Sequence, residues 1–372
     1  MVSLPETAVP RTWRAPGRVN LIGDHTDYQD GWCLPMAVDR ECRVTVAAPS
    51  GPGIRARSAQ IPGVVEVAAD GATAPSTVEP PWGRFVAGAV AACIAAGIPV
   101  APGDLTVTST VPLGSGLSSS AALAVALVVA FTDLAGAPRD RTDLARLAQD
   151  AELRATGVPG GLLDQMTALH AVPGHVLLLD CRTLTVEPIP LPRALGVVVV
   201  HSGRARTLVG SPYAERRAQV EAAAAHLGVT ALRDATEDQV RDDPRARHVV
   251  TENARVLAFA DALRAGRTGE LGPLMLASHA SLRDDYAVST PELDRAVDLL
   301  MEHGALGARL TGAGFGGCVV ALVQRNHGDD VLAKVTRTLA ATGEADPVAF
   351  AVRPGLPAAE VTPSEGAAPP GG

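Results

Sequence analysis

Hydrophobic positions along this 372-residue chain follow two spacings, one typical of strands and one typical of helices. Residues 38–47 are rich in valine and alternate between apolar and polar side chains, which predicts a strand. Residues 105–111 are also strand-like, and the apolar run 195–201 predicts a buried strand. Residues 142–156 place leucine and alanine at helical spacing, with Thr142 expected as the N-cap.

The other expected elements complete a mixed pattern. The same spacings predict strands at 175–179, 307–311 and 318–323, and helices at 85–96, 120–134, 212–227, 246–265, 271–282 and 291–302. Residues 1–14 are expected to be an irregular lead-in, and the proline- and glycine-rich stretches 49–53 and 71–81 are expected to be loops.

The length and the proline pattern indicate two domains. Prolines at 190 and 192 mark the expected boundary, which gives an N-terminal domain over 1–189 and a C-terminal domain over 190–353. Residues 354–372 are poor in large apolar side chains and rich in Pro, Gly and Ala, so we expect a disordered tail there.

Charge and cysteine content exclude several classes of protein. The formal net charge of −8 argues against a nucleic-acid or anionic-membrane partner, because both require a basic face. The longest apolar run, 121–131, is about half of the roughly 20 residues that a membrane span needs. The five cysteines are widely spaced without a Cys-x-x-Cys pair, and the N-terminus lacks the pattern of a signal peptide. We therefore expect a cytoplasmic protein without a disulfide or zinc framework.

The scarcity of lysine restricts how the chain can bind phosphate. The 32 basic residues comprise Lys334 and 31 arginines. A P-loop kinase needs a lysine beside its phosphate loop, and none stands near a glycine-rich segment of this chain. A phosphate site must therefore use backbone N–H groups, a helix N-terminus, a metal ion or arginine.

One glycine-rich segment has the local pattern of such a phosphate site. The strand predicted at 105–111 is followed by Gly114 and Gly116, which permit close backbone approach. The serines at 118–120 then open a helix, whose free N–H groups and dipole attract anions. An ordinary serine N-cap after a glycine turn would produce the same pattern.

Two further segments carry candidate chemistry. Asp24, His25 and Asp27 crowd a short loop and could bind vicinal hydroxyls, although a metal site or a solvated turn would use the same residues. Residues 312–317 formally match the dinucleotide-binding fingerprint Gly-x-Gly-x-x-Gly. That fingerprint must open a helix, whereas a strand is predicted at 318–323, so we reject a dinucleotide-binding role.

Two carboxylates lie where burial is expected. Asp164 follows two glycines and two leucines, so it should be partly buried, and Arg18 is a candidate partner for its charge. Such a carboxylate could take a proton from a hydroxyl or orient it, although an Asp that caps a helix start is an equally good explanation. Glu152 lies four residues after Ala148, at the edge of an apolar helix stripe.

Residues 17–28 (Gly-Arg-Val-Asn-Leu-Ile-Gly-Asp-His-Thr-Asp-Tyr) resemble the signature of the galactokinases. Residues 112–121 resemble the ATP-binding motif that is shared by the GHMP kinases, and residues 311–317 resemble their third motif. The resemblance extends over about residues 13–325. It implies an α+β fold of two domains, with the active site in the interdomain cleft. The implied reaction is the phosphorylation of D-galactose by ATP at its C1 hydroxyl, the entry step of galactose catabolism.

The resemblance also implies a role for each matching residue. Asp164 would be the catalytic base or hydroxyl-orienting group, and Arg18 would neutralise charge on the γ-phosphate. The sugar would be held by Asp24, His25, Asp27, Gly161 and Tyr213. The ATP phosphates would be bound by Gly114, Ser115, Gly116, Leu117, Ser118, Ser119 and Ser120, with Gly314 and Gly316 flanking the site. Ser120 and Glu152 would complete the shell of a Mg²⁺ ion. The expected partners are small molecules, and we expect a monomer.

One residue departs from the family signature, which commonly carries Glu where this chain has Asp24. The shorter side chain leaves open which sugar is preferred, with N-acetylgalactosamine and arabinose as alternatives. A catalytically silent sensor of galactose and ATP is a further alternative. The intact serines at 118–120 and Asp164 favour an enzyme.

Overall fold

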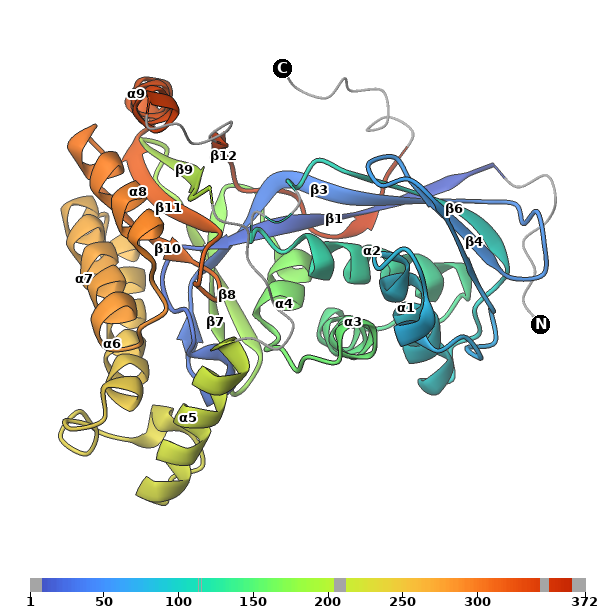
Figure 1. Ribbon diagram of the computed structural model, residues 1–372, viewed down its shortest axis with the longest axis horizontal. Helices are drawn as coiled ribbons and strands as arrows, with labels where there is room; N and C mark the ends of the chain where they lie inside the picture. The colour runs from blue at the N-terminus through green and yellow to red at the C-terminus, as the bar shows by residue number, and fades with distance from the viewer. Residues whose placement is uncertain (1–8, 113, 115, 204–211, 342–347, 363–372) are drawn as a thin grey trace.

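Two long antiparallel strands, β1 (Arg11–Asn20) and β3 (Pro35–Ala47), run through the molecule (Figure 1). β1 ends within the first sequence motif, at residues 17–28, and β3 begins opposite the end of β1. The computed structural model describes residues 9–112, 114, 116–203, 212–341 and 348–362. β1 and β3 belong to a six-stranded sheet of order β13-β1-β3-β6-β4-β5. Its other strands are β4 (Ile54–Ser58), β5 (Val64–Val67), β6 (Gly103–Ser109) and β13 (Ala359–Glu360). The expected irregular lead-in over 1–14 is wrong from Arg11 onward, because β1 begins there.

Four helices pack together beneath this sheet in the view of Figure 1. They are α1 (Gly83–Ala95), α2 (Ser119–Leu134), α3 (Arg141–Thr156) and α4 (Leu163–His170). Helix α2 is apolar around almost its whole circumference because it is buried between the sheet and the other helices. The expected N-cap of α3, Thr142, is wrong: the helix begins earlier, and the Asp140 side chain accepts the backbone N–H of Asp143 at 2.9 Å.

A second sheet explains the run of valines at 197–200. It has the order β10-β11-β9-β12 and comprises β9 (Leu195–His201), β10 (Gly307–Thr311), β11 (Cys318–Gln324) and β12 (Ala349–Val352). Val198 and Val200 face a core with α8 (Pro291–Glu302) and α9 (Gly328–Ala341). Val197 and Val199 face a different core on the other side. Since both faces are covered, the strand needs apolar residues at every position.

The remaining elements are a small sheet, three helices and several short 3₁₀ helices. A three-stranded sheet contains β2 (Trp32–Cys33), β7 (His175–Asp180) and β8 (Thr185–Pro190). The other helices are α5 (Pro212–Leu227), α6 (Pro244–Arg264) and α7 (Leu271–Asp284), with short 3₁₀ helices at Asp27–Gln29, Pro75–Thr77, Leu232–Asp234, Thr268–Glu270 and Arg325–His327. One hydrophobic core unites Val19, Val176 and Phe259, so packing is continuous across residue 190. The division into domains at 189/190 stays a prediction.

The chain end has more structure than its composition predicts. Gly355 donates its N–H to the carbonyl of Ala37 at 2.8 Å, and β13 pairs with the edge of β1. The expectation of a disordered tail is therefore wrong for residues 354–362, which cover an otherwise open sheet edge. Residues 363–372 lie outside the described residues. Within the described part of the chain, no helix combines the length and apolar character of a membrane span.

Candidate active site

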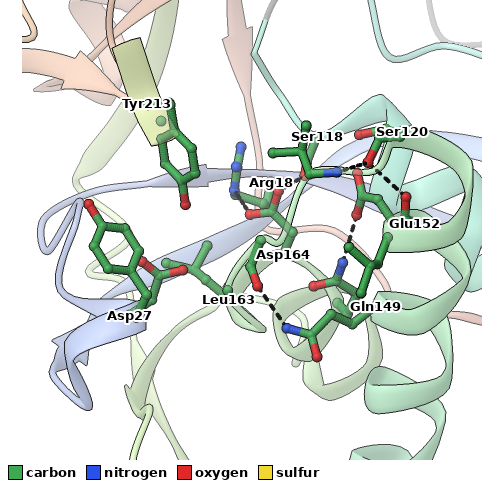
Figure 2. Close-up of a pocket in the computed structure, with 18 of the residues that line it drawn as sticks. Arg18, Asp27, Ser118, Ser120, Gln149, Glu152, Leu163, Asp164 and Tyr213 are labelled. Atoms are coloured by element: carbon green, nitrogen blue, oxygen red, sulfur yellow. Dashed lines mark hydrogen bonds and ion pairs between the residues drawn. The ribbon is translucent and has the colours of Figure 1, made fainter. Parts of the chain in front are cut away.

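A cavity of about 280 Å³ lies between the two halves of the molecule (Figure 2). Its walls come from the loop after β1, the start of α2, helices α3 to α5 and the loop between β10 and β11. Among the described residues the predicted site residues that line it are Arg18, Asp24, His25, Asp27, Ser118, Ser120, Glu152, Gly161, Asp164 and Tyr213. The structure therefore brings together groups from all three glycine-rich segments.

Asp164 lies at the centre of this cavity and is held by two side chains. It belongs to the first turn of α4, and its side chain is 27% exposed, so the expected partial burial is confirmed. Arg18 donates from Nε to Asp164 Oδ1 at 2.5 Å, which confirms the predicted pairing. Ser118 donates its hydroxyl to the other carboxylate oxygen. The carboxylate is thus fixed in orientation, and the serine contact was not predicted.

The first and second glycine-rich segments touch each other directly. Arg18 donates its backbone N–H to the carbonyl of Leu117 at 3.1 Å and its guanidinium Nη1 to the carbonyl of Gly116 at 2.8 Å. A Cβ atom at Gly17 would lie 2.6 Å from the Leu117 carbonyl oxygen, so only glycine permits this approach. Ser118 adopts the left-handed conformation at the N-terminus of α2, which turns its hydroxyl toward Asp164.

Glu152 and Ser120 lie at the far side of the cavity from Asp27 and Tyr213 in Figure 2. Gln165 donates to Glu152 Oε2 at 2.8 Å. Burial raises the pKa of Glu152 to about 7; a hydrogen bond from Ser120 opposes the rise, and the negative charge of Asp164 adds to it. Glu152 is therefore a half-buried carboxylate whose hydrogen-bond partners are neutral, which fits a bound cation.

The residues around Glu152 are compatible with Mg²⁺. In the described ranges no group of three His, Cys, Asp or Glu side chains gathers as a metal cluster. Mg²⁺ does not need one, because it commonly takes one or two carboxylates and completes its shell with water and substrate phosphates. The hydroxyl of Ser120 and the carboxylate of Glu152 are both hard oxygen donors of this kind.

Asp27, Gly161 and Tyr213 form the opposite wall. A Cβ atom at Gly161 would lie 1.7 Å from Asp27 Oδ2, so the absence of a side chain at 161 makes room for this carboxylate. Burial, followed by repulsion from Asp164 and Asp24, raises the pKa of Asp27 to about 6. The Tyr213 ring lies 5.8 Å from the His25 ring, centroid to centroid.

A chain of hydrogen bonds holds His25. Its Nε2 lies 3.2 Å from the carbonyl oxygen of Ala313, and its Nδ1 lies 2.8 Å from Tyr28 Oη. A carbonyl can only accept, so in the neutral ring Nε2 carries the proton and Nδ1 accepts from Tyr28. Tyr28 then accepts from the hydroxyl of Tyr286 at 2.8 Å. Tyr286 is fully buried and was not predicted.

Asp24 also reaches across to the C-terminal half. Its Oδ1 accepts the backbone N–H of Gly312 at 3.0 Å, and its Oδ2 lies 2.6 Å from Nη1 of Arg309. Burial raises the pKa of Asp24, and the positive charge of Arg309 opposes that rise. Sequence reasoning missed Arg309, although a lone arginine within the strand predicted at 307–311 was a detectable signal.

Several predicted ATP-binding residues lie near the cavity rather than on its wall. Among the described residues, Gly114, Gly116, Leu117, Ser119, Gly314 and Gly316 do not line it. In the third loop the lining residues are instead Gly312 and Ala313. The rejected dinucleotide fingerprint is indeed followed by a strand, β11. Ser115 lies outside the described residues.

Comparisons with known proteins agree with this arrangement. Family models match three parts of the chain: the galactokinase galactose-binding signature at residues 6–48, the GHMP kinase N-terminal domain at 84–171 and the GHMP kinase C-terminal region at 259–341. The fold resembles that of a Methanococcus jannaschii mevalonate kinase, with a TM-score of 0.69 at 18% identity, over 93% of this chain and 99% of that one. The fold is that of a GHMP kinase.

More similar relatives define the family within that class. A galactokinase of Mycobacterium tuberculosis (strain ATCC 25177 / H37Ra) is 44% identical over 90% of this chain and 95% of its own. A galactokinase of Roseiflexus sp. (strain RS-1) is 44% identical over 84% and 83%. The structure of Lactococcus lactis galactokinase complexed with galactose matches with a TM-score of 0.88 at 30% identity, over 95% and 96%. The chain belongs to the galactokinase family, and it is an enzyme of that class.

Proposed function

We propose that this enzyme transfers the γ-phosphoryl group of ATP to the C1 hydroxyl of D-galactose, giving galactose 1-phosphate and ADP. The observation that carries the proposal is the position of Asp164, fixed by Arg18 and Ser118 between two unlike walls of one cavity. One wall, with Asp24, His25 and Asp27, suits a polyhydroxylated substrate. The other, with Ser120 and Glu152, suits a metal-bound phosphate chain.

Asp164 is the proposed base or hydroxyl-orienting group. A new bond forms between the C1 oxygen and the γ-phosphorus, and the bond from that phosphorus to the β,γ-bridging oxygen breaks. The hydroxyl proton leaves toward Asp164. Because phosphoryl transfer requires mainly positioning and charge stabilisation, a carboxylate with a fixed orientation is well suited to this step.

Arg18 is the proposed charge-stabilising group. Its Nε is engaged by Asp164, and its Nη1 donates to the Gly116 carbonyl. The guanidinium is thereby held at the junction of the sugar and phosphate motifs, where transferred phosphoryl oxygens would meet it. No lysine is present near the cavity to take this role, since Lys334 is the only lysine of the chain.

Ser120 and Glu152 are the residues that would hold Mg²⁺. When bound, the ion would neutralise negative charge on the phosphates of ATP. The N-terminus of α2, which Ser118 opens, would add backbone N–H donors for the same phosphates. Gly114 to Ser119 stay predicted contacts of ATP, as do Gly314 and Gly316.

The sugar would lie against the loop after β1. Asp24 and Asp27 offer acceptors for hydroxyl protons, while His25 and Tyr213 form a ring-bearing wall beside them. Gly161 has no side chain, so it leaves room for the Asp27 carboxylate beside this wall. Vicinal hydroxyls could thus be bound by several side chains at once.

The test is ADP release from Mg·ATP across galactose, 2-deoxygalactose, N-acetylgalactosamine, arabinose and glucose. We expect the highest kcat/KM with galactose. If another sugar gives a higher kcat/KM, the proposed phosphoryl transfer stands, but galactose is not the preferred substrate. Galactose binding without turnover of any sugar would contradict the enzyme proposal and indicate a sensor.

A further inference from the structure

Arg309 is a fully buried charged side chain beside the cavity residue Asp24. It lies on β10, whose five residues are all buried, and its side chain has no exposed surface. Moving a guanidinium out of water is costly unless nearby acceptors compensate for it. The groups that it contacts therefore indicate what its presence achieves.

The principal partner of Arg309 is Asp24. Nη1 lies 2.6 Å from Asp24 Oδ2 and donates to the carbonyl of Asn20 at 3.1 Å. The only other carboxylate recorded near it in the described residues is that of Glu252, 4.0 Å from Nη2.

Glu252 is already compensated by other groups. It accepts from Arg255 Nε at 2.7 Å, from the Ser278 hydroxyl at 2.5 Å and from the Gly23 N–H at 2.9 Å. Its pKa is about 2, because the charges of Arg255, His248 and Arg309 outweigh the opposing effect of burial. Arg309 is therefore needed by Asp24 more than by Glu252.

Asp24 is held from the C-terminal half of the molecule at both oxygens. Arg309 engages Oδ2 and the backbone of Gly312 engages Oδ1, while the carboxylate still borders the cavity. Oδ2 is buried beside Arg309, so a substrate hydroxyl would meet the carboxylate at Oδ1, which has two acceptor sites and gives one of them to Gly312. The protein contacts fix the direction of these sites.

We propose that Arg309 is a positioning residue for sugar recognition, which holds the carboxyl group of Asp24 in the orientation that accepts a galactose hydroxyl. This role rests on the proposed function. It also explains how this chain can use aspartate where the family signature commonly carries the longer glutamate. The orientation of the shorter side chain is fixed by an arginine and a backbone N–H.

The first test replaces Arg309 by lysine and measures kcat, KM for galactose, KM for ATP and the melting temperature. Lysine keeps the charge but cannot reproduce the guanidinium geometry. We expect KM for galactose to rise roughly tenfold, as for a lost charge-assisted hydrogen bond, with KM for ATP changed less than about twofold. A lower melting temperature with unchanged KM for galactose would overturn the proposal, because a purely structural role predicts that result.

Arg255→Lys is the matched control. Arg255 pairs with Glu252 in the same buried group of charges and has no recorded contact with Asp24 in the described residues. We expect it to lower the melting temperature while KM for galactose stays within about twofold of wild type. A rise in KM for galactose equal to that of Arg309→Lys would overturn the proposal. Any disturbance of the buried charges would then be enough to weaken galactose binding, whether or not it touched Asp24.

A second pair of variants covers the case in which Arg309→Lys does not fold. Asp24→Asn alone is compared with Asp24→Asn/Arg309→Gln, which removes both buried charges together. If Arg309 acts through Asp24, the two proteins have the same KM for galactose. A further fivefold rise in the double variant would overturn the proposal. Wild-type protein without galactose turnover would overturn the proposed function and this role together, whereas the variant comparisons test Arg309 alone.

Discussion

The carboxylates Asp24 and Glu152 border one cavity and meet very different surroundings. Asp24 faces a buried arginine, Arg309, and a backbone N–H. Glu152 is held by the neutral side chains of Gln165 and Ser120, and its pKa rises to about 7. The first carboxylate has its counter-charge within the protein. The second has neutral hydrogen-bond partners, which is the difference expected if Asp24 shapes the proposed sugar site and Glu152 binds the proposed metal ion.

Asp164 lies between these extremes. Its counter-ion, Arg18, is also the residue that we propose to meet a phosphoryl group. When substrate is bound, the guanidinium can interact with both the carboxylate and the phosphate, because it carries five N–H donors. The ion pair of Arg18 and Asp164 therefore lies between the proposed sugar wall and the proposed phosphate wall. Replacing Asp164 is the strongest test of this division of the cavity.

The largest expected effect is that of Asp164→Asn. The amide keeps the shape but cannot take a proton, so kcat should fall about 10²–10⁴-fold while galactose binding is largely retained. Turnover and galactose affinity would be measured on the same preparation. Asp150→Asn is the control, because Asp150 pairs with Arg154 on the exposed face of the same α3 helix that carries Glu152. Near wild-type kcat in Asp164→Asn would refute the assigned role.

Glu152→Gln is expected to have the next largest effect. Removal of the charge should raise the Mg²⁺ concentration for half-maximal activity by about 10–100-fold, the range seen when groups of a metal site are altered. KM for galactose should change little, because Glu152 lies on the opposite wall from Asp27. An unchanged Mg²⁺ titration would make Glu152 a structural residue and remove the contrast with Asp24.

The parts of the site that could be predicted from sequence are those made by neighbouring residues. The glycine turn, the serines at 118–120 and the group Asp24, His25 and Asp27 each lie within a few positions, so their proximity is dictated by the chain itself. The pairing of Asp164 with Arg18 was also predicted, from the chemical need of a partly buried carboxylate for a cation.

Contacts between distant segments could not be predicted in the same way. Nothing in the spacing indicates that Ser118 reaches Asp164 or that Arg309 reaches Asp24, because these contacts depend on how elements distant in the sequence pack together. The tail shows the same limit. Residues 354–362 have the composition of a disordered segment, yet they gain order from the exposed edge of β1, which no local property of the tail describes.

The difference between the two walls should also appear in pH-dependent stability. The folded pKa of Glu152, about 7, lies above the ordinary value of a glutamate side chain, 4.5. A carboxyl group shifted in this direction stabilises the fold at low pH, and the contribution is lost as pH rises through the folded pKa. Without metal or nucleotide, wild type should therefore lose stability relative to Glu152→Gln between about pH 5 and pH 8, by at most about 3 kcal/mol.

Melting temperatures of both proteins in EDTA across that range provide the measurement. Asp27 contributes in the same direction in both proteins, because its folded pKa of about 6 is also raised, so it cancels in the difference. Addition of Mg·ATP at pH 8 should restore stability to wild type more than to the variant. A difference between the two proteins that is the same at pH 5 and pH 8 would show that Glu152 does not carry a raised pKa.

The smallest expected effect is that of Tyr286→Phe. This variant tests whether the hydrogen bonds of His25, as well as the ion pair of Asp24 with Arg309, hold the proposed sugar wall in place. The ring, packed 4.6 Å from that of His25, remains, and only the hydroxyl that donates to Tyr28 is removed. Since Tyr28 in turn orients His25, KM for galactose should rise about threefold, the effect of one neutral hydrogen bond, with KM for ATP unchanged. Tyr28→Phe should have the larger effect, because it removes the donor to His25 itself. If both variants keep the wild-type KM for galactose, the orientation of His25 is set by Ala313 and ring packing, and Asp24 with Arg309 carries the rigidity of this wall.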